Sequence, residues 1–213
     1  MPTPNAIHMG HGQMVDIQEP GAGQWQLMFS EAGVADYKAP PLADIKVEAI
    51  DGDGNIHALS VGSSGNPSAV LVKGHVAGAR RARVMVMHGD HYHTRESVLP
   101  GKAELAPVPG AQGGSVVRFG AATVEAKLVA ADAFELHFTT LQGAPMPPPS
   151  ADAVVMQAIG PKAEDYQIRN LTMRAGDKPG TLIASGKVKD ATHLRLTLKS
   201  GSAAEVRSVP VIR

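Results

Sequence analysis

The side chains best suited to chemistry lie in one nine-residue stretch, Met85-Val86-Met87-His88-Gly89-Asp90-His91-Tyr92-His93. Thioether and imidazole groups together suit Cu(I), or Cu(II) where imidazole and carboxylate predominate. Imidazoles and a carboxylate without thioether would suit zinc, nickel or cobalt. We interpret the stretch as a metal-binding β-hairpin, with copper (Cu⁺ or Cu²⁺) as the preferred ion.

A second group with the same chemistry stands near the N-terminus, in His8-Met9-Gly10-His11. It could complete the hairpin site or bind a metal by itself. The predicted ligands are therefore His88, Asp90, His91, His93, Met85, Met87, His8, Met9 and His11. Because residues 1–12 are also rich in Pro and Gly, we predict that this segment is flexible.

Composition excludes several classes of function. The 213 residues carry 20 basic and 20 acidic side chains, and this balance argues against nucleic acid or an anionic membrane as the main partner. The absence of cysteine excludes disulfides, thiolate catalysis, cysteine zinc sites and iron–sulfur clusters. No apolar run approaches the ~20 residues of a membrane-spanning helix, so we expect no membrane insertion.

Short apolar runs between turn residues predict strands along most of the chain, and helix-period patterns are nearly absent. The Asp51-Gly52-Asp53-Gly54-Asn55 segment lacks the rest of a calcium loop and is predicted to be a hairpin turn. The predicted strands are Trp25–Phe29, Ile45–Ile50, Ile56–Val61, Ala69–Val72, Arg83–His88, Val116–Phe119, Val124–Val129, Phe134–Thr140, Val154–Ile159, Tyr166–Met173, Thr181–Ala184, His193–Leu198 and Glu205–Val211.

The second half of the chain repeats the first. Ile45–Ile50 aligns with Val154–Ile159, and each follows a proline cluster and an Ala-Asp pair. We also align the segment that opens the first copy, Gly12-Gln13-Met14-Val15, with Gly114-Ser115-Val116-Val117 at the start of the second. A repeat of short strands with frequent turns is typical of tandem sandwich domains.

We therefore predict an all-β protein of two tandem immunoglobulin-like antiparallel β-sandwich domains. The first domain spans 13–106 and carries the metal-binding hairpin. A linker covers 107–112, and the second domain spans 113–213 without the histidines.

The repeat also predicts how the hairpin is oriented. Leucines at alternate positions of His193–Leu198 should face the core, so Val84 and Val86 should do the same. A loop of three or five residues would place Met87 opposite His93. The predicted outer cluster is then Met85, Met87, His91 and His93, where the second copy has Thr197, Lys199, Ala203 and Glu205. The fold would not need the histidines.

Two other functions fit parts of the sequence. Outward methionines form adaptable apolar patches, so Met85 and Met87 could instead serve a scaffold or interaction module, or a homodimer. A metal-dependent hydrolase is a third interpretation, but it needs further ligands on other strand ends, and none is found. Since nucleophile-elbow, phosphate-loop and dinucleotide motifs are also absent, we expect no enzymatic activity.

One resemblance covers nearly the whole chain as two copies. The opening segment His11-Gly12-Gln13-Met14-Val15 resembles the His-Gly-Gly-Gln-Val-type start of small exported bacterial β-sandwich proteins associated with heavy-metal efflux and copper handling. This chain has one glycine after His11, and its second copy has no histidine there. The resemblance implies a periplasmic location, a role in metal resistance or homeostasis, and His11 as a ligand.

The resemblance further suggests a metal efflux or chaperone protein as a partner. The start Met1-Pro2-Thr3-Pro4-Asn5 has neither a basic region nor an apolar one, so we expect the export signal to have been removed.

Overall fold

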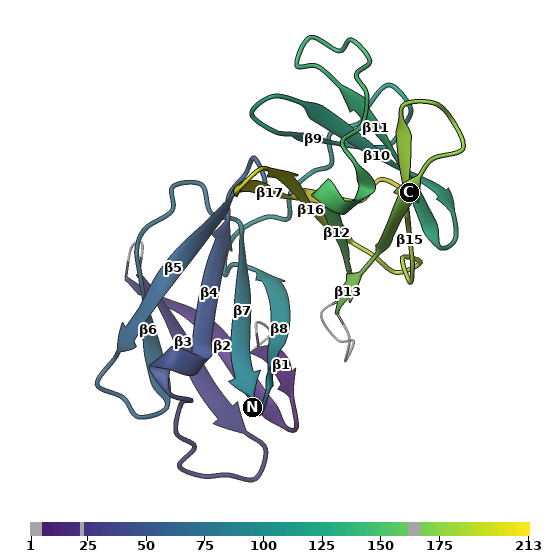
Figure 1. Ribbon diagram of the computed structural model, residues 1–213. Helices are drawn as coiled ribbons and strands as arrows, with labels where there is room; N and C mark the ends of the chain where they lie inside the picture. The colour runs from purple at the N-terminus through teal and green to yellow at the C-terminus, as the bar shows by residue number, and fades with distance from the viewer. Residues whose placement is uncertain (1–5, 22–23, 162–166) are drawn as a thin grey trace. The chain divides into compact units, whose positions relative to one another are not determined.

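Antiparallel strands make up almost all regular structure in the computed structural model, which describes residues 6–21, 24–161 and 167–213 (Figure 1). These residues contain seventeen strands and two short 3₁₀ turns, so the all-β prediction is confirmed. Among them there is no helix with the length and apolar content needed to cross a membrane.

The described chain divides into two compact units. The first runs to Glu104 and includes Gln167, and the second comprises Leu105–Pro161 and Ile168–Arg213. The first unit contains β1 (Ala6–Gly10), β2 (Gln13–Gly21), β3 (Gln24–Glu31), η1 (Leu42–Asp44), β4 (Ile45–Ile50), β5 (Ile56–Ser63), β6 (Ala69–Lys73), β7 (Arg81–His88) and β8 (His91–Val98).

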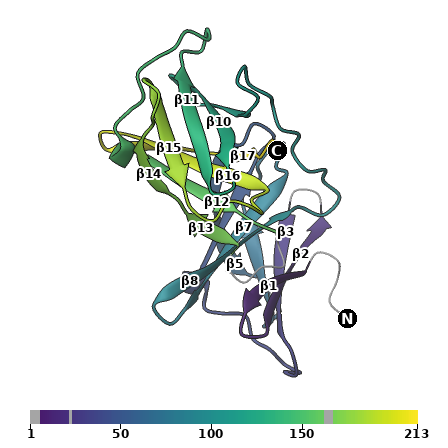
Figure 2. The ribbon, with the colours of Figure 1, turned by 90° about the vertical axis from the view of Figure 1, so that its right-hand side faces the viewer.

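The first unit is one eight-stranded sheet, in the order β1-β2-β3-β6-β5-β4-β7-β8. The sheet curls until its two end strands, β1 and β8, contact each other, which gives a near-barrel (Figures 1 and 2). Alternate residues point inward, as Val15 and Ile17 do on β2 and Leu27 and Phe29 on β3. Each such buried side chain contributes about 1.5–3 kcal/mol, so the apolar alternation determines which face lies inside.

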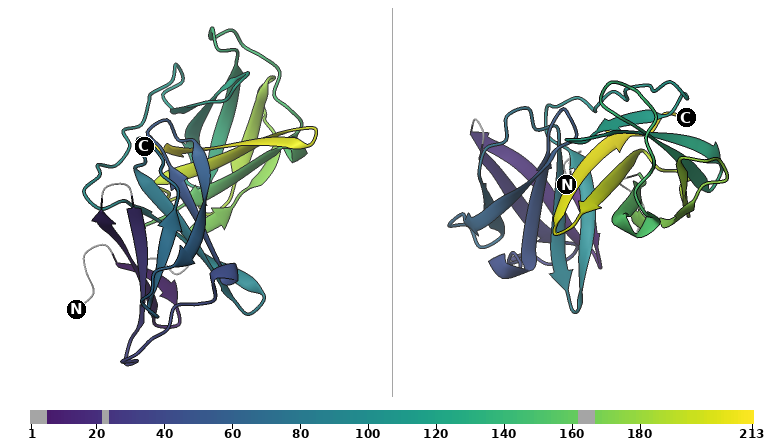
Figure 3. Two further views of the ribbon diagram at one scale, coloured as in Figure 1. Left: turned by 90° about the vertical axis from the view of Figure 1, so that its left-hand side faces the viewer. Right: turned by 45° about the horizontal axis from the view of Figure 1, so that its top comes forward.

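The second unit has two sheets around one core. Its strands are β9 (Ser115–Arg118), β10 (Thr123–Ala130), β11 (Ala133–Thr139), β12 (Val154–Ile159), β13 (Ile168–Asn170), β14 (Thr172–Ala175), β15 (Thr181–Ser185), β16 (His193–Ser200) and β17 (Ala203–Pro210), with η2 at Ala151–Ala153. The sheets are β14-β15-β11-β10-β9 and β13-β12-β16-β17, and both contribute to the same apolar cluster. Figure 3 shows the yellow β16–β17 hairpin crossing the green strands.

Both units have the same strand order. The order β1-β2-β3-β6 in the first unit corresponds to β9-β10-β11-β15 in the second. In the same way, β4-β7-β8 corresponds to β12-β16-β17. The difference is β5, a continuous strand in the first unit whose place is taken by the shorter β13 and β14 in the second. Ile45–Ile50 and Val154–Ile159 also have identical burial patterns, each following a short 3₁₀ turn.

This topology corrects two sequence-based predictions. The part of 1–12 that the structure describes is not a flexible segment, because Ala6–Gly10 forms β1 and its Ile7 and Met9 side chains are 0% and 1% exposed. The alignment of the two opening segments is also wrong, since β9 takes the place of β1 and not of β2. Apolar residues two positions apart, Ile7 and Met9, were the overlooked strand signal.

The predicted turn after β4 is stabilised by one carboxylate. Asp51 Oδ1 accepts hydrogen bonds from the backbone N–H groups of Asp53 and Asn55, both at 2.9 Å. Asp51 Oδ2 accepts one from the Asn55 amide at 2.8 Å and contacts His57 Nε2 at 2.9 Å. Burial alone would raise the pKa of Asp51, but the bonds from His57, Asn55 and Asp53 outweigh it and hold the pKa below its ordinary value.

Asp51→Asn should destabilise the first unit by roughly 2 kcal/mol at neutral pH, because the charged acceptor of several hydrogen bonds is lost. A folded-state pKa below the unfolded one means that the ionised carboxylate adds stability above pH ~3.9. This stability is lost as the pH falls through the folded pKa, so the difference between variant and wild type should shrink there. Denaturant unfolding at several pH values measures it.

The matched control is Asp53→Asn in the same turn, where the side chain is exposed. It should change stability by less than about 0.5 kcal/mol. Equal effects of the two substitutions at neutral pH would contradict the role given to Asp51.

Candidate metal centre

The β7–β8 hairpin turns through only two residues, Gly89 and Asp90. Its strands pair His88 with His91 and Val86 with His93. Gly89 has a φ of 64°, and a glycine with positive φ at the first central position is typical of a type II′ turn. The sister hairpin β16–β17 has the same turn length, with Gly201 at the matching place.

This register separates the predicted ligands. Directly opposed residues share a face, so His91 and His93 lie on the side of the buried Val86, while Met85 and Met87 pair with Thr94 and Tyr92 on the other side. The prediction that methionines and histidines share one outer face is therefore wrong. The loop has two residues where three or five were expected, and a slip of one residue exchanges the faces of a strand.

The β1–β2 turn brings a fourth histidine to the hairpin. Its residues Gly10, His11 and Gly12 all have positive φ, at 98°, 50° and 80°. His11 is the one non-glycine residue with positive φ in the described chain. The other two residues predicted from this segment point elsewhere, because Met9 is buried in the core and His8 is exposed on the opposite face of β1.

Four imidazole rings gather where these two turns meet, and we call them the histidine cluster. Its members are His11, His88, His91 and His93. The His11 and His88 rings stack at a centroid distance of 4.6 Å, and those of His91 and His93 at 4.9 Å. His93 is central, since its ring lies 5.5 Å from that of His11 and 5.2 Å from that of His88.

The Nδ1 atoms of two cluster members are already engaged. His93 Nδ1–H donates a hydrogen bond to the backbone carbonyl of Met9 on β1. His91 Nδ1–H donates one to Asp90 Oδ1 at 2.9 Å. Metal-binding histidines usually donate their other N–H to a carbonyl or carboxylate in this way. Sequence reasoning named Met9 for its sulfur and missed its carbonyl, since only the β1 strand conformation reveals that contact.

With both Nδ1 atoms protonated, the neutral rings present lone pairs at Nε2. The Nε2 atoms of His91 and His93 face each other at 3.1 Å. Two lone pairs at this distance repel, so the pair requires a proton or another cation between them. Burial lowers the pKa of the His93 imidazole, the Met9 carbonyl opposes this, and the neighbouring histidines lower it further. A proton on His93 is thus disfavoured.

The cluster is not a finished coordination sphere. Within the described ranges, no group of three or more His, Asp or Glu side chains is arranged to hold a metal ion as it stands. The stacked His11 and His88 rings would have to rotate to direct nitrogens at an ion beside the His91–His93 pair. Two imidazole nitrogens therefore face each other, and the His11 and His88 rings lie 5.5 and 5.2 Å from the His93 ring.

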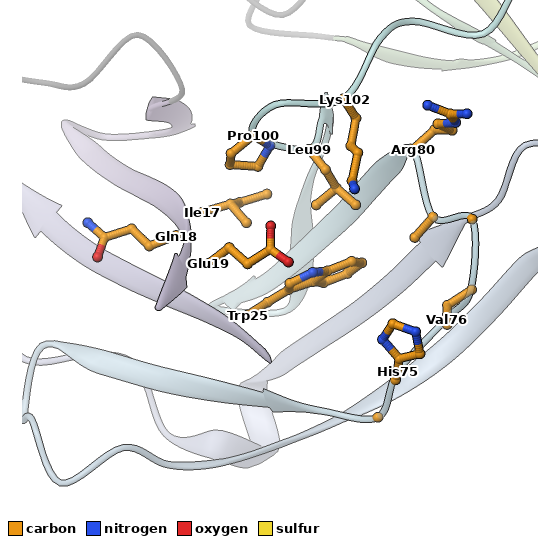
Figure 4. A pocket seen from close by; sticks show the side chains of 13 residues that line it. Ile17, Gln18, Glu19, Trp25, His75, Val76, Arg80, Leu99, Pro100 and Lys102 are labelled. Carbon is orange, nitrogen blue, oxygen red and sulfur yellow. The ribbon is translucent and has the colours of Figure 1, made fainter. Parts of the chain in front are cut away.

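A separate hollow of about 200 Å³ lies at the opposite end of the β7–β8 hairpin, in the first unit (Figure 4). The Trp25 indole spans it, with Ile17 and Leu99 beside the ring. His75 lines this hollow and is remote from the histidine cluster. Its lining includes a single histidine, so it offers no comparable set of nitrogen ligands.

Comparison with known proteins identifies no relative by sequence. No protein-family description matches the chain. No curated protein matches it either. A solved structure titled "Anomalous substructure of Titin-A168169" is 10% identical and aligns over 88% of this chain and 87% of that chain, with a TM-score of 0.21. We draw no conclusion from a match at this level.

Gly10→Ala should disturb the cluster, because a Cβ at this position would lie 2.7 Å from His93 Nδ1. The His93 ring would have to move and release the Met9 carbonyl, and alanine would also be strained at a φ of 98°. We expect a loss of about 2–3 kcal/mol in unfolding free energy. Denaturant unfolding, together with NMR shifts of the His93 ring, measures both effects.

Gly33→Ala is the matched control, since Gly33 has a φ of 82° but open space around it. It carries the backbone strain without the clash. If both variants lose the same stability and the His93 signals stay unchanged, the close approach of Gly10 to His93 has no energetic role.

Proposed function

We propose that this protein binds a divalent transition-metal ion at the histidine cluster. The observation that carries the proposal is the His91–His93 pair, whose Nε2 atoms lie 3.1 Å apart while both Nδ1 atoms donate to oxygen acceptors. In the metal-free protein a single proton can bridge this pair, whichever of the two rings carries it. A metal ion satisfies both lone pairs at once.

The spacing suits two ligands of one ion. Nitrogens bound at about 2.0–2.1 Å lie about 3.3 Å apart in a tetrahedron and about 2.9 Å apart at a right angle. The observed 3.1 Å falls between these values. His11 and His88 would supply the remaining ligands after rotation, and Asp90 would orient His91 from behind.

The ligand chemistry favours a borderline ion over a soft one. Met85 and Met87 lie on the other face of the hairpin, so their thioethers do not join the imidazoles there. An imidazole set suits Cu(II), Zn(II), Ni(II) and Co(II), and among these Cu(II) binds most tightly to nitrogen sites. We therefore retain copper as the preferred ion, in its Cu(II) form.

The proposal includes a setting for this site. We propose that both units are variants of the immunoglobulin-like sandwich, a scaffold whose loops and hairpin tips commonly carry function. A cysteine-free chain with a histidine site suits an oxidising compartment such as the periplasm. There it would bind metal for resistance or homeostasis, with an efflux or chaperone protein as the partner that receives the ion.

The double variant His91→Ala/His93→Ala should lose Cu(II) and Zn(II) binding, because the two preformed donors are removed. Affinity should fall by at least about a hundredfold. Competition against a chromophoric chelator measures it, with protein purified without an affinity tag. Unchanged affinity in this variant would exclude the histidine cluster as the site.

Two controls separate this site from the other predicted ligands. His8→Ala removes an exposed histidine on the opposite face of β1, and Met85→Ala/Met87→Ala removes the thioethers from the opposite face of the hairpin. Both should bind Cu(II) as the wild type does. The methionine variant also tests the scaffold alternative, since it should then lose any metal-independent dimer seen by light scattering.

A further inference from the structure

In each unit the first strand lies beside the last, and we call the contact between these two strands the seam. The seam joins β1 to β8 in the first unit and β9 to β17 in the second. In the second unit a carboxylate spans it. Where β9 meets β17, Glu205 Oε2 accepts a hydrogen bond from the backbone N–H of Gly120 at 2.9 Å. Ser115 on β9 holds the chain end beyond β17, accepting from the N–H of Ile212 at 2.8 Å. Hydrogen bonds between side chains and backbone groups thus hold β9 and β17 together.

The first unit fastens the corresponding seam with an imidazole. His93 occupies on β8 the position that Glu205 occupies on β17, since both stand two residues into their strands. It joins β8 to the Met9 carbonyl of β1. Among the described residues, no backbone pairing register connects β1 with β8, so this contact supplies a polar link that the strand pairing does not.

The Glu205 carboxylate and the His93 imidazole differ in their remaining hydrogen-bonding capacity. Both oxygens of a carboxylate are acceptors of the same kind, whereas an imidazole that donates from Nδ1 still has a lone pair at Nε2. That lone pair faces the His91 Nε2 atom. The atom that would bind the ion therefore belongs to the same ring that holds the seam closed.

We infer that a metal ion at the histidine cluster controls closure of the seam between β1 and β8, so that β1 is held firmly in the metal-bound protein and loosely in the metal-free protein. This inference rests on the proposed function. A bound cation withdraws electron density from the ring and strengthens Nδ1–H as a donor to Met9. If His11 also binds, the ion links the β1–β2 turn directly to β8.

Such a link constrains the chain strongly. Met9 and His93 are 84 positions apart in the sequence, and a cross-link over a long loop removes much conformational freedom from the open state. The open form would release two strand edges, which are ready to pair with another chain. Metal binding would thereby regulate how much of the β1 and β8 edges is available.

The test is amide hydrogen exchange of the whole protein with and without saturating Zn(II), with binding measured in parallel by chelator competition. We expect exchange in Ala6–Gly10 and in the first half of β8 to slow at least tenfold with Zn(II). Strands β10 and β11 of the second unit serve as the internal control and should not change. Zn(II) is chosen because it is redox-inert and compatible with NMR.

Two variants sharpen the test. His11→Ala should still bind Zn(II), though more weakly, and should lose most of the added protection of β1. His93→Gln keeps an amide donor for the Met9 carbonyl but lacks the imidazole, so it should show the same exchange with and without Zn(II).

The outcomes are distinguishable. Zn(II) binding that leaves exchange of β1 unchanged would overturn the seam inference while the proposed function stands. Absence of Zn(II) and Cu(II) binding would remove the proposed function and this inference with it. Slower exchange confined to the hairpin tip, without β1, would also overturn control of the seam.

Discussion

One hydrogen bond, from His93 to the carbonyl of Met9, joins the sheet of the first unit end to end. An eight-stranded sheet can bury Ile7 and Met9 only if β1 stays against the curled remainder, and the ends β1 and β8 have no backbone register in the described chain to hold them. Gly10 permits the close approach, because any Cβ would meet the imidazole. One member of the histidine cluster, His93, thus links the two end strands at the point where two turns meet.

Comparison of the two units separates what the fold requires from what the first unit adds. Each unit has a polar side chain near the start of its last strand that bonds to a backbone group, and in the second unit Glu205 accepts a hydrogen bond from Gly120. Sequence comparison correctly shows that no histidine is needed at this place. It does not show that the position has a structural role, because that role depends on a backbone group distant in sequence.

The sequence predicts the strands far better than their mutual register. Ile45–Ile50 and Val154–Ile159 match the structure residue for residue, because alternating burial leaves a direct trace in the order of apolar residues. The length of a turn is harder to predict from the order of apolar residues. The sequence suggested a β7–β8 loop of three or five residues, which would place Met87 opposite His93. The turn has two residues, so Met87 and His93 lie on opposite faces of the hairpin. His193 is 2% exposed, and its strand β16 is paired with β12 on one side and with β17 on the other.

The hollow opposite the histidine cluster contains the chain's single tryptophan. Trp25 belongs wholly to the first unit and packs against that unit's apolar core. Intrinsic tryptophan fluorescence therefore monitors the first unit alone, whereas circular dichroism averages over strands of both. In this protein two optical signals recorded during one unfolding experiment would give the stabilities of two structurally similar units separately.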